Sequence, residues 1–556
     1  GIDYYTERAK GGTGLIITGV TFVDNEIEKH AMANLPCSTL NPIQFIRTAR
    51  EMTERIHAYD AKVFLQMSGG FGRVAIPEVL GDFPPIAPSE VEHRWLDKTC
   101  RELEIHEIKS IVKKFGDGVQ IHAVHEGYLI DQFAISFFNK RTDEYGGSLE
   151  NRLRFAREIV EEIKNRCGSD FPVTLRYSPK SFIKDFRDGA LPNEEFIEKG
   201  RDLEEGIEAA RLLVSYGYDA LDVDVGSYDS WWWSHPPMYQ AKGLYRSFAK
   251  LIKEIVDVPI LCAGRMDNPD MALKSIENET CDIISLGRPL LADPDYVNKL
   301  RGNKVKSIRP CISCQEGCMG RIQHYSMLNC AVNPQACKKR TNALNPISRK
   351  KKVLVVGGGV AGCEAARVLA LRGHDVTLYE KEDRLGGNLI PGGAPDFKED
   401  DILLATWYTD TLKELGVKVN LNSKITKNEI LNFNADSVII ATGSIPRVFS
   451  LGDDEKVFTA ADVLMDKKDC KSNTVIIGGG LVWCETALYL AKKGKKVPII
   501  EALHKLLAVN GPLCSANKEM LEKLIPFNNI DVKLNSKAKF FKDGVLEIEN
   551  KNGIEK

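Results

Sequence analysis

Four cysteines fall within the twenty residues CISCQEGCMGRIQHYSMLNC at 311–330. Their spacing, C-x2-C-x3-C-x11-C, puts three thiols on one tight loop and returns a fourth from a short excursion. The four residues are Cys311, Cys314, Cys318 and Cys330. Thiolates arranged in this way suit an iron–sulfur cube or a tetrahedral zinc ion, and the spacing alone leaves both open. We expect neither His324 nor Cys337 to be a ligand.

A glycine-rich segment after the cysteines has the residues that bind a dinucleotide. The run KKVLVVGGGVAGCEAARVLALRGHDVTLYEK (351–381) is typical of a strand, a glycine turn, a helix and a second strand. Gly357, Gly359 and Gly362 form G-x-G-x-x-G, and Glu380 follows the second strand, where a carboxylate would bind a ribose hydroxyl. In this context the motif predicts a Rossmann-like fold.

A second segment, NTVIIGGGLVWCETALYLAKKGKKVPIIE (473–501), repeats the pattern with Gly478, Gly480 and Glu501. An acid at Glu501 favours NADH over NADPH, because a carboxylate would repel a 2′-phosphate. Trp483 replaces the third glycine, where helix–strand packing leaves almost no room for a side chain. We expect the indole to displace the helix or fill the pyrophosphate site, and so to impair NADH binding.

The first 300 residues alternate short β-branched runs with amphipathic helix patterns. The runs are 12–20, 61–68, 117–124, 171–179, 220–227, 259–265 and 281–288. Such alternation predicts parallel strands joined by crossover helices. A (β/α)8 TIM barrel closes with eight strands, and the chain begins at Gly1 on a helix-like stretch. We therefore expect a barrel whose first strand is missing.

Polar groups stand at the C-terminal ends of these runs, where barrel enzymes hold their active sites. They are Gln66, His122, His125, Arg176 and the pairs Gly264-Arg265 and Gly287-Arg288. A Gly-Arg pair at a strand end could bind a phosphate through backbone N–H and guanidinium groups. The alternatives are an ordinary turn with a surface arginine and, for His122, a histidine of the core.

The run IHAVHEGYLIDQFAISFFNKRTDEYGGSLENRLRF (121–155) resembles the signature of the old yellow enzyme family of FMN-dependent ene reductases. With the later motifs, the chain is similar over nearly its whole length to the large members of that family. These are 2,4-dienoyl-CoA reductase, trimethylamine dehydrogenase, 2-enoate reductase and the bile-acid-inducible NADH-dependent flavin oxidoreductases. The resemblance implies a 4Fe-4S cluster, since CAVNP (330–334) is similar to the family's cluster segment. It also implies FAD in the first Rossmann-like fold, where DSVIIATGSIPR (436–447) resembles the family's ATG strand.

The resemblance also implies roles for single residues. Reduced FMN would pass a hydride to the β-carbon of an alkene conjugated to a carbonyl, and Tyr128 would protonate the α-carbon. His122 and His125 would bind the carbonyl oxygen. Compared with the H-A-A-H-G-Y of smaller relatives, the additional Glu126 leaves the register of His125 and Tyr128 open.

The flavin contacts follow from the same resemblance. Gln66 would bind the FMN ring, Arg176 its N1 side or ribityl chain, and the two Gly-Arg pairs its phosphate. Electrons would pass from NADH to FAD, to the 4Fe-4S cluster, to FMN and to an unsaturated carbonyl substrate, which could be an enoate, an enone or a bile-acid-like 3-oxo-4-ene.

Two alternatives stay open. One is an amine dehydrogenase of the trimethylamine dehydrogenase type, whose covalent FMN needs an early cysteine, for which only Cys37 is available. The other is an electron-transfer remnant without turnover, because Trp483 and the truncation that we expect at both ends would disable the chain.

An aromatic run, Trp231, Trp232 and Trp233, follows the fifth strand-like run. We expect that three consecutive indoles cannot all face a core, so that at least one lines a pocket or a subunit interface. His235, just after them, could cover the substrate or hold the loop.

The bulk composition limits the classes of partner. Lys plus Arg is 75 and Asp plus Glu is 77, which gives a formal charge of -2. The net charge therefore provides no electrostatic attraction for nucleic acid or an anionic membrane. The chain has no long apolar run and no signal pattern, so we expect a soluble, cytoplasmic protein. We expect small molecules as its partners and leave assembly into a homo-oligomer open. Single cysteines such as Cys262 and Cys281 lie in apolar runs and are expected to be buried thiols.

A chain of 556 residues exceeds one hydrophobic core. We divide it into an FMN-binding barrel (1–304), a cluster segment with linker (305–349), an FAD-binding domain (350–471) and an incomplete NAD(H)-binding domain (472–556).

Overall fold

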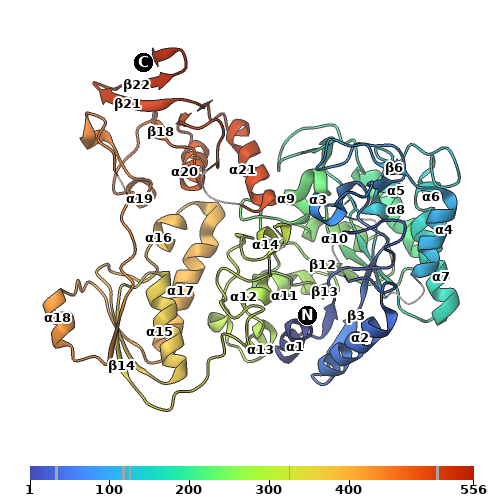
Figure 1. Ribbon diagram of the computed structural model, residues 1–556, viewed down its shortest axis with the longest axis horizontal. Coiled ribbons are helices and arrows are strands. Elements are labelled where there is room, and N and C mark those ends of the chain that lie inside the picture. Colours follow the sequence, from blue (N-terminus) through green and yellow to red (C-terminus); the bar gives the residue numbers. More distant parts are fainter. Residues whose placement is uncertain are drawn as a thin grey trace. The chain divides into compact units, whose positions relative to one another are not determined.

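The protein is described by a computed structural model covering residues 1–31, 36–115, 119–123, 125, 127–324, 326–446, 448–508 and 513–555. The chain forms two compact units (Figure 1). The first unit comprises Gly1–Pro236, Gln240–Leu290 and Pro294–Arg301, and the second comprises Pro237–Tyr239, Leu291–Asp293 and Gly302–Lys556.

A seven-stranded parallel sheet is the centre of the first unit. Its strands are, in spatial order, β13 (Ile283–Ile284), β12 (Ile260–Cys262), β11 (Ala220–Val223), β8 (Thr174–Tyr177), β7 (Gln120–His122), β4 (Gln66–Ser68) and β2 (Thr21–Phe22). Each strand pairs in parallel with the next one along the chain, as in a TIM barrel. β1 (Leu15–Ile17) and β3 (Lys62–Phe64) form a further parallel pair just before β2 and β4. Every run that the sequence indicated therefore contains a strand.

Helices connect these strands. The longer ones are α1 (Ile2–Lys10), α2 (Pro42–His57), α4 (Ile105–Lys114), α7 (Arg154–Cys167), α8 (Leu203–Ser215), α10 (Arg246–Lys253), α11 (Pro269–Glu277) and α13 (Tyr296–Arg301). Short ones are α3 (Pro77–Leu80), α5 (Leu129–Ala134), α6 (Leu149–Arg152), α9 (Trp231–Ser234) and α12 (Pro289–Ala292). In α7 the buried residues Phe155, Ile159 and Ile163 recur every four positions, so one face packs inward. Two small strand pairs, β5 (Ile86–Ala87) with β6 (Arg101–Glu102) and β9 (Ile183–Asp185) with β10 (Asp188–Gly189), lie in the loops.

The three consecutive tryptophans are all buried, so the expectation that they cannot all face a core is wrong. Trp231, Trp232 and Trp233 are 3%, 0% and 7% exposed. They form the helical turn α9, in which successive side chains point about 100° apart. The segment that contains β9 and β10 encloses this turn. The indoles of Trp232 and Trp233 both donate to the carbonyl of Ala190 (2.9 and 2.7 Å), and the ring of Trp233 stacks on that of Phe182 with centroids 3.7 Å apart.

The cysteine segment and its short helix α14 (Met319–Gln323) lie near the start of the continuous part of the second unit. A parallel sheet follows, in the order β16 (Lys418–Asn420), β15 (Asp375–Tyr379), β14 (Lys352–Val356) and β17 (Ser437–Ile440). Its helices are α15 (Val360–Arg372), α16 (Leu389–Gly392), α17 (Glu399–Glu414) and α18 (Lys427–Asn432). The β14–α15–β15 order confirms the Rossmann-like pattern of the first glycine segment. Arg447, the last residue of the ATG motif, lies outside the described residues.

The second glycine segment has the same order in a smaller sheet. β18 (Ile476–Ile477), β19 (Ile499–Ile500) and β20 (Val532–Lys533) are parallel, and α20 (Leu481–Lys492) connects the first two. α19 (Ala460–Leu464) precedes them and α21 (Ser515–Phe527) lies between β19 and β20. An antiparallel sheet of β21 (Lys537–Lys542), β22 (Val545–Asn550) and β23 (Gly553–Glu555) ends the described chain. Across the residues described, no helix has the length and apolar character needed to span a bilayer.

Candidate active site and cofactor segments

A row of buried side chains crosses the interior of the barrel sheet. The amide nitrogen of Gln66 donates to Oε1 of Gln120 at 2.6 Å, and the amide of Gln120 reaches the carboxylate of Asp222 at 3.5 Å. Gln66 and Gln120 lie on the neighbouring strands β4 and β7, and Asp222 lies on β11, one strand beyond β8. Burial raises the pKa of the Asp222 carboxyl above its ordinary value. Gln66 is the first residue of β4 and not at the C-terminal end of its strand, where the sequence predicted it, and it belongs to a network with two residues that the sequence did not indicate.

Next to this row, His122 and His125 form a hydrogen-bonded pair. Their Nε2 atoms are 3.0 Å apart, and Nδ1 of His125 lies 2.6 Å from Oδ2 of Asp224. The same carboxylate oxygen accepts from Nε of Arg176 at 3.1 Å. Both histidines are buried. Asp224 therefore connects two of the predicted site residues, His125 and Arg176. A carboxylate beside Nδ1 also favours one orientation of the imidazole.

Tyr128 joins this group through its ring. It precedes α5, its ring centroid is 4.2 Å from that of His122, and Phe71 packs against it at 5.1 Å. The hydroxyl of Tyr128 is 3.3 Å from the hydroxyl of Tyr228, which follows β11. The predicted residues His122, His125 and Tyr128 therefore meet at the C-terminal ends of the strands. Val124 and Glu126, in the same motif, lie outside the described residues.

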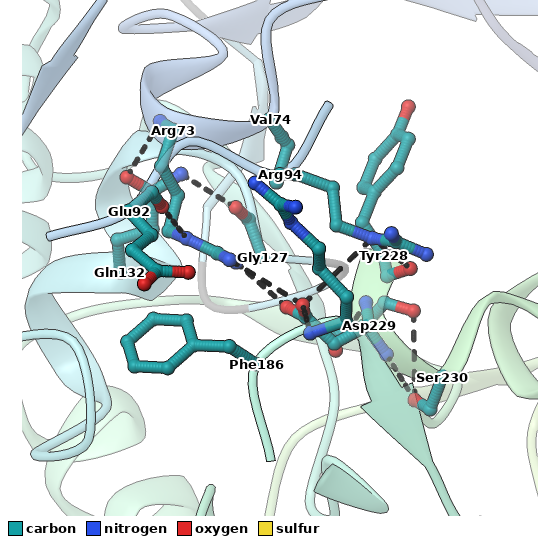
Figure 2. Close-up of polar contacts among 12 residues, drawn as sticks. Arg73, Val74, Glu92, Arg94, Gly127, Gln132, Phe186, Tyr228, Asp229 and Ser230 are labelled. Atoms are coloured by element: carbon teal, nitrogen blue, oxygen red, sulfur yellow. Dashed lines mark hydrogen bonds and ion pairs between the residues drawn. The ribbon is translucent and has the colours of Figure 1, made fainter. Parts of the chain in front are cut away.

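A buried ion pair holds the loop that carries Tyr228 (Figure 2). Nη1 of Arg73 is 2.7 Å from Oδ2 of Asp229, and these side chains are 0% and 1% exposed. Nε of Arg94 donates to the backbone carbonyl of Tyr228 at 3.2 Å and lies 3.7 Å from Asp229. Burial tends to raise the pKa of the Asp229 carboxyl, but the charges of Arg73 and Arg94 outweigh it and lower that pKa. Charges and backbone contacts therefore fix the position of Tyr228.

The two Gly-Arg pairs contact one loop. The guanidinium of Arg265 donates to the carbonyl of Gln240, and that of Arg288 donates to the carbonyl of Pro236 at 2.8 Å. Gly264 has a φ of +85°, and a Cβ there would lie 2.7 Å from the ring of Tyr245. Arg265 is buried, which contradicts the alternative of a surface arginine for this pair. The α-carbon of Gly287, in the second pair, faces open space.

The four cysteines of the cluster segment lie close together in the second unit. Burial raises the pKa of the Cys314 thiol, and the nearby Cys311, Cys318 and Cys330 raise that pKa further. A Cβ at Gly317 would lie 2.9 Å from the α-carbon of Cys330, which brings the excursion back beside Cys318. Ser313 and Gln315 have φ values of +51° and +60°, which tighten the loop around Cys314. Among the residues that the structure describes, no three His, Cys, Asp or Glu side chains meet as a preformed metal site.

The first glycine turn has the geometry that a dinucleotide needs. Gly357 has a φ of +106°, and a Cβ at Gly362 would lie 1.8 Å from the carbonyl oxygen of Gly357. Helix α15 therefore starts in direct contact with the turn, as only glycine permits. Gly359 is the N-cap of α15. The carboxylate of Glu380 accepts the N–H of Gly358 at 2.6 Å, so it lies beside the turn.

The second turn has a similar backbone conformation, but a tryptophan replaces its third glycine. Gly478 has a φ of +110°, Gly480 is the N-cap of α20, and the carboxylate of Glu501 accepts the N–H of Gly479. Trp483 stands where Gly362 stands in the first turn, and a Cβ on Gly478 would be 3.1 Å from its indole ring. Because a Cβ would clash at Gly362, the helix and turn must lie farther apart in the second copy.

The sequence did not indicate Asp224, Tyr228 or the Arg73–Asp229 pair. One signal was present, since Asp222 and Asp224 alternate along one strand-like run and so share a face near its C-terminal end. The contacts of Tyr228 with Tyr128 and of Asp229 with Arg73 join residues 100 and 156 positions apart, for which the sequence holds no local pattern.

A parallel barrel sheet with these groups at its strand ends, followed by two glycine-turn folds, is the architecture of a flavin-dependent oxidoreductase that takes electrons from a nicotinamide. The family comparison agrees with this class. The chain belongs to the NADH:flavin oxidoreductase / NADH oxidase family, whose model matches residues 1–306. The model of the pyridine nucleotide-disulphide oxidoreductases matches residues 330–432 and 351–555.

Individual relatives are similar over most of the chain. Cinnamate reductase of Clostridium sporogenes is 59% identical over 548 residues, which covers 96% of this chain and 82% of that protein. NADH oxidase of Thermoanaerobacter brockii is 38% identical over 521 residues, covering 90% of this chain and 77% of that one. A solved structure of 2-naphthoyl-CoA reductase with 2-naphthoyl-CoA has a TM-score of 0.89 at 27% identity, and covers 99% of this chain and 84% of its own.

Proposed function

We propose that this protein reduces the C=C bond of an aryl enoate of the cinnamate type with electrons from NADH. The observation that carries the proposal is the buried group of His122, His125 and Tyr128 at the strand ends, in a chain 59% identical to a cinnamate reductase. An imidazole that can bind an oxyanion, a second imidazole that holds it in the donating form, and a phenol that can donate a proton suit this reaction.

The hydrogen bonds between the histidines define how they can act. For His122 to donate to a substrate oxygen through Nδ1, its Nε2 must accept from Nε2–H of His125. His125 then carries both N–H groups, and its Nδ1 lies 2.6 Å from Oδ2 of Asp224, at ion-pair distance. Asp224 therefore stabilises the form of the pair that binds an oxyanion. Bound flavin would supply the hydride for the β-carbon, and Tyr128 would move its proton to the α-carbon.

The aromatic surroundings of Tyr128 favour a flat aryl substrate. Tyr228 lies between Tyr128, at 5.7 Å between ring centroids, and Trp231, at 4.7 Å. Trp95 extends the cluster, at 5.7 Å from Trp231. Trp231 is itself buried and packs on Tyr228, whose ring, with that of Tyr128, would suit stacking or edge-to-face contacts with an aromatic ring.

The barrel residues fit FMN. The buried amide of Gln66 would bind the polar edge of the ring system, and Arg176, held by Asp224, would lie on the N1 side. Arg265 and Arg288, with Gly264 and Gly287, would hold the phosphate, because guanidiniums and backbone N–H groups at strand ends suit a phosphate ester.

The donor set of the cysteine segment fits a 4Fe-4S cluster. Cys311, Cys314 and Cys318 lie on one tight loop, and Cys330 returns beside Gly317 in the same loop. Binding requires these thiols to turn toward a common centre. A cluster between two flavins would carry single electrons from FAD to FMN, whereas a zinc ion, the other candidate for four thiolates, has no redox role.

We assign FAD to the first glycine turn and NADH to the second, in which Glu501 would receive the ribose hydroxyls. The assignment divides the chain into residues 1–304 for FMN, 305–349 for the cluster, 350–471 for FAD and 472–556 for NAD(H). The carboxylate of Glu501 favours NADH over NADPH, because it would repel the 2′-phosphate of NADPH.

An anaerobic steady-state assay tests the proposal. The purified chain, loaded with FMN, FAD and iron–sulfide, is incubated with NADH and cinnamate, and 3-phenylpropionate is measured with NADH loss. We expect equal amounts of product formed and NADH consumed, with slower reduction of an aliphatic enoate of the same charge. Loss of NADH without formation of the saturated product would contradict the proposal. The proposal would also be contradicted if a secondary amine reduced the flavin but cinnamate did not reoxidise the reduced flavin.

A further inference from the structure

We propose that Tyr228 returns the proton that Tyr128 loses in each turnover and stabilises the Tyr128 phenolate through a hydrogen bond. This inference rests on the proposed function, because it assumes that Tyr128 is the proton donor. Tyr228 acts through Tyr128 and is therefore a positioning and relay residue.

The first support is the contact between the two phenols. Their hydroxyl oxygens are 3.3 Å apart and their rings stack at 5.7 Å with an interplanar angle of 25°. Tyr128 follows β7 and Tyr228 follows β11, so the barrel, and not local sequence, brings them together. The separation is longer than the usual 2.7–2.8 Å of an O–H···O bond, and such bonds shorten when one oxygen is charged. A phenolate on Tyr128 would therefore strengthen the contact.

The second support is the enclosure of Tyr128. Its side chain is 7% exposed, and the rings of Phe71 and His122 pack against it. A phenolate with so little solvent contact needs a nearby donor, because burying an unpaired charge is costly. The hydroxyl of Tyr228 is in position to be that donor.

The third support is the way Tyr228 is held. Arg94 donates to its backbone carbonyl, and its neighbour Asp229 is paired with the buried Arg73 (Figure 2). The ring of Trp231 packs on the ring of Tyr228 at 4.7 Å. These contacts fix the backbone and the ring of Tyr228, so its hydroxyl is held beside that of Tyr128 and proton transfer needs only a small approach of the two oxygens.

The proton balance is as follows. The O–H bond of Tyr128 breaks as the Cα–H bond of the product forms, which leaves a phenolate. The O–H bond of Tyr228 then breaks as that of Tyr128 re-forms, and solvent returns one proton to Tyr228. The electron pair that reduces the C=C bond comes from NADH through bound flavin, so the relay moves protons only.

The variant Tyr228→Phe tests the relay because it removes one hydroxyl and keeps the ring. We expect kcat for cinnamate reduction to fall about 10- to 100-fold, as for loss of a hydrogen bond to a charged group. The KM for cinnamate and the rate of flavin reduction by NADH should stay within twofold of the parent, and the solvent deuterium isotope effect on kcat should increase.

The matched control is Tyr218→Phe, which removes another buried hydroxyl of the barrel, one that donates to the carbonyl of Ala156 at 2.7 Å. It should leave kcat and the isotope effect unchanged within twofold. Equal kcat and isotope effects in Tyr228→Phe and the control would overturn the relay.

A second measurement does not depend on turnover. The phenolate absorbance of Tyr128 is obtained as a function of pH from the difference between each protein and its Tyr128→Phe variant, with and without Tyr228→Phe. We expect Tyr128 to ionise at a pH at least one unit higher when Tyr228 is phenylalanine, because the phenolate loses its donor. An unchanged titration would overturn the relay, even if the parent reduces no enoate and the proposed function fails. If the parent reduces cinnamate but neither the Tyr128 titration nor kcat changes in Tyr228→Phe, the relay is contradicted and the proposed function is retained.

Discussion

The buried pair of Arg73 and Asp229 allows a quantitative prediction. The variant Asp229→Asn keeps the shape of the side chain but removes the charge that faces Arg73 at 2.7 Å, in a place where neither side chain is more than 1% exposed. Arg73 and Arg94 would then be two neighbouring guanidiniums without that carboxylate. Removing one partner of a buried ion pair costs about 3–5 kcal/mol, because the remaining charge stays desolvated.

The control is Asp185→Asn. The carboxylate of Asp185 is 2.6 Å from Nζ of Lys199, but these side chains are 55% and 42% exposed. An exposed ion pair contributes about 0–1 kcal/mol. The two substitutions are chemically identical, so their difference isolates the effect of burial.

The assay is urea unfolding at pH 7, followed by tryptophan fluorescence. Four of the six tryptophans, Trp95, Trp231, Trp232 and Trp233, lie in the first unit and report mainly on the barrel. The midpoint of that transition is compared, since a chain of two units need not unfold in one step. The pKa of Asp229 is lowered in the folded protein, so its stabilisation is complete above the ordinary pKa near 4 and is lost only as the pH falls below it. A midpoint for Asp229→Asn as high as that for Asp185→Asn would refute this reasoning.

Four further predictions concern the cofactors and the chemistry. Tyr128→Phe should lower kcat for cinnamate reduction by about 10²- to 10⁴-fold without loss of flavin, as steady-state kinetics and flavin absorbance would measure. Cys314→Ser should lose bound iron, measured by colorimetric assay, whereas Cys337→Ser should keep it; full iron in both would refute the ligand assignment. Gly362→Ala should lose FAD, measured by release and chromatography of flavin, because its Cβ would lie 1.8 Å from a carbonyl oxygen. Trp483→Gly should bind NADH more tightly in a fluorescence titration, and equal affinity in the parent would show that the indole is tolerated.

Local patterns explain why the overall architecture could be predicted. The strand-like runs of the barrel are short and largely apolar and alternate along the chain with amphipathic helix patterns, so the parallel sheet follows from neighbouring stretches. The glycine turns are also local, since the positive φ of Gly357 and the close approach at Gly362 leave almost no choice of residue.

Contacts between distant segments explain the rest. Asp224 orients His125 from another strand, and Tyr228 meets Tyr128 across the sheet. The burial of Trp232 also depends on a distant segment, whose Ala190 carbonyl accepts its indole N–H, so a run of indoles could not reveal it. Cysteine spacing predicts a set of ligands, but the choice between iron–sulfur and zinc depends on chemistry that spacing does not encode.

The central claim is that NADH electrons reach a conjugated C=C bond through the cofactors of this chain. An anaerobic titration followed by ultraviolet–visible absorption, with flavin and iron measured on the same sample, tests it most directly. We predict that NADH bleaches the flavin and cluster bands, and that cinnamate then restores them with one 3-phenylpropionate formed per electron pair. Bands that dithionite bleaches but NADH does not, or a reduced protein that no conjugated enoate reoxidises, would contradict the account.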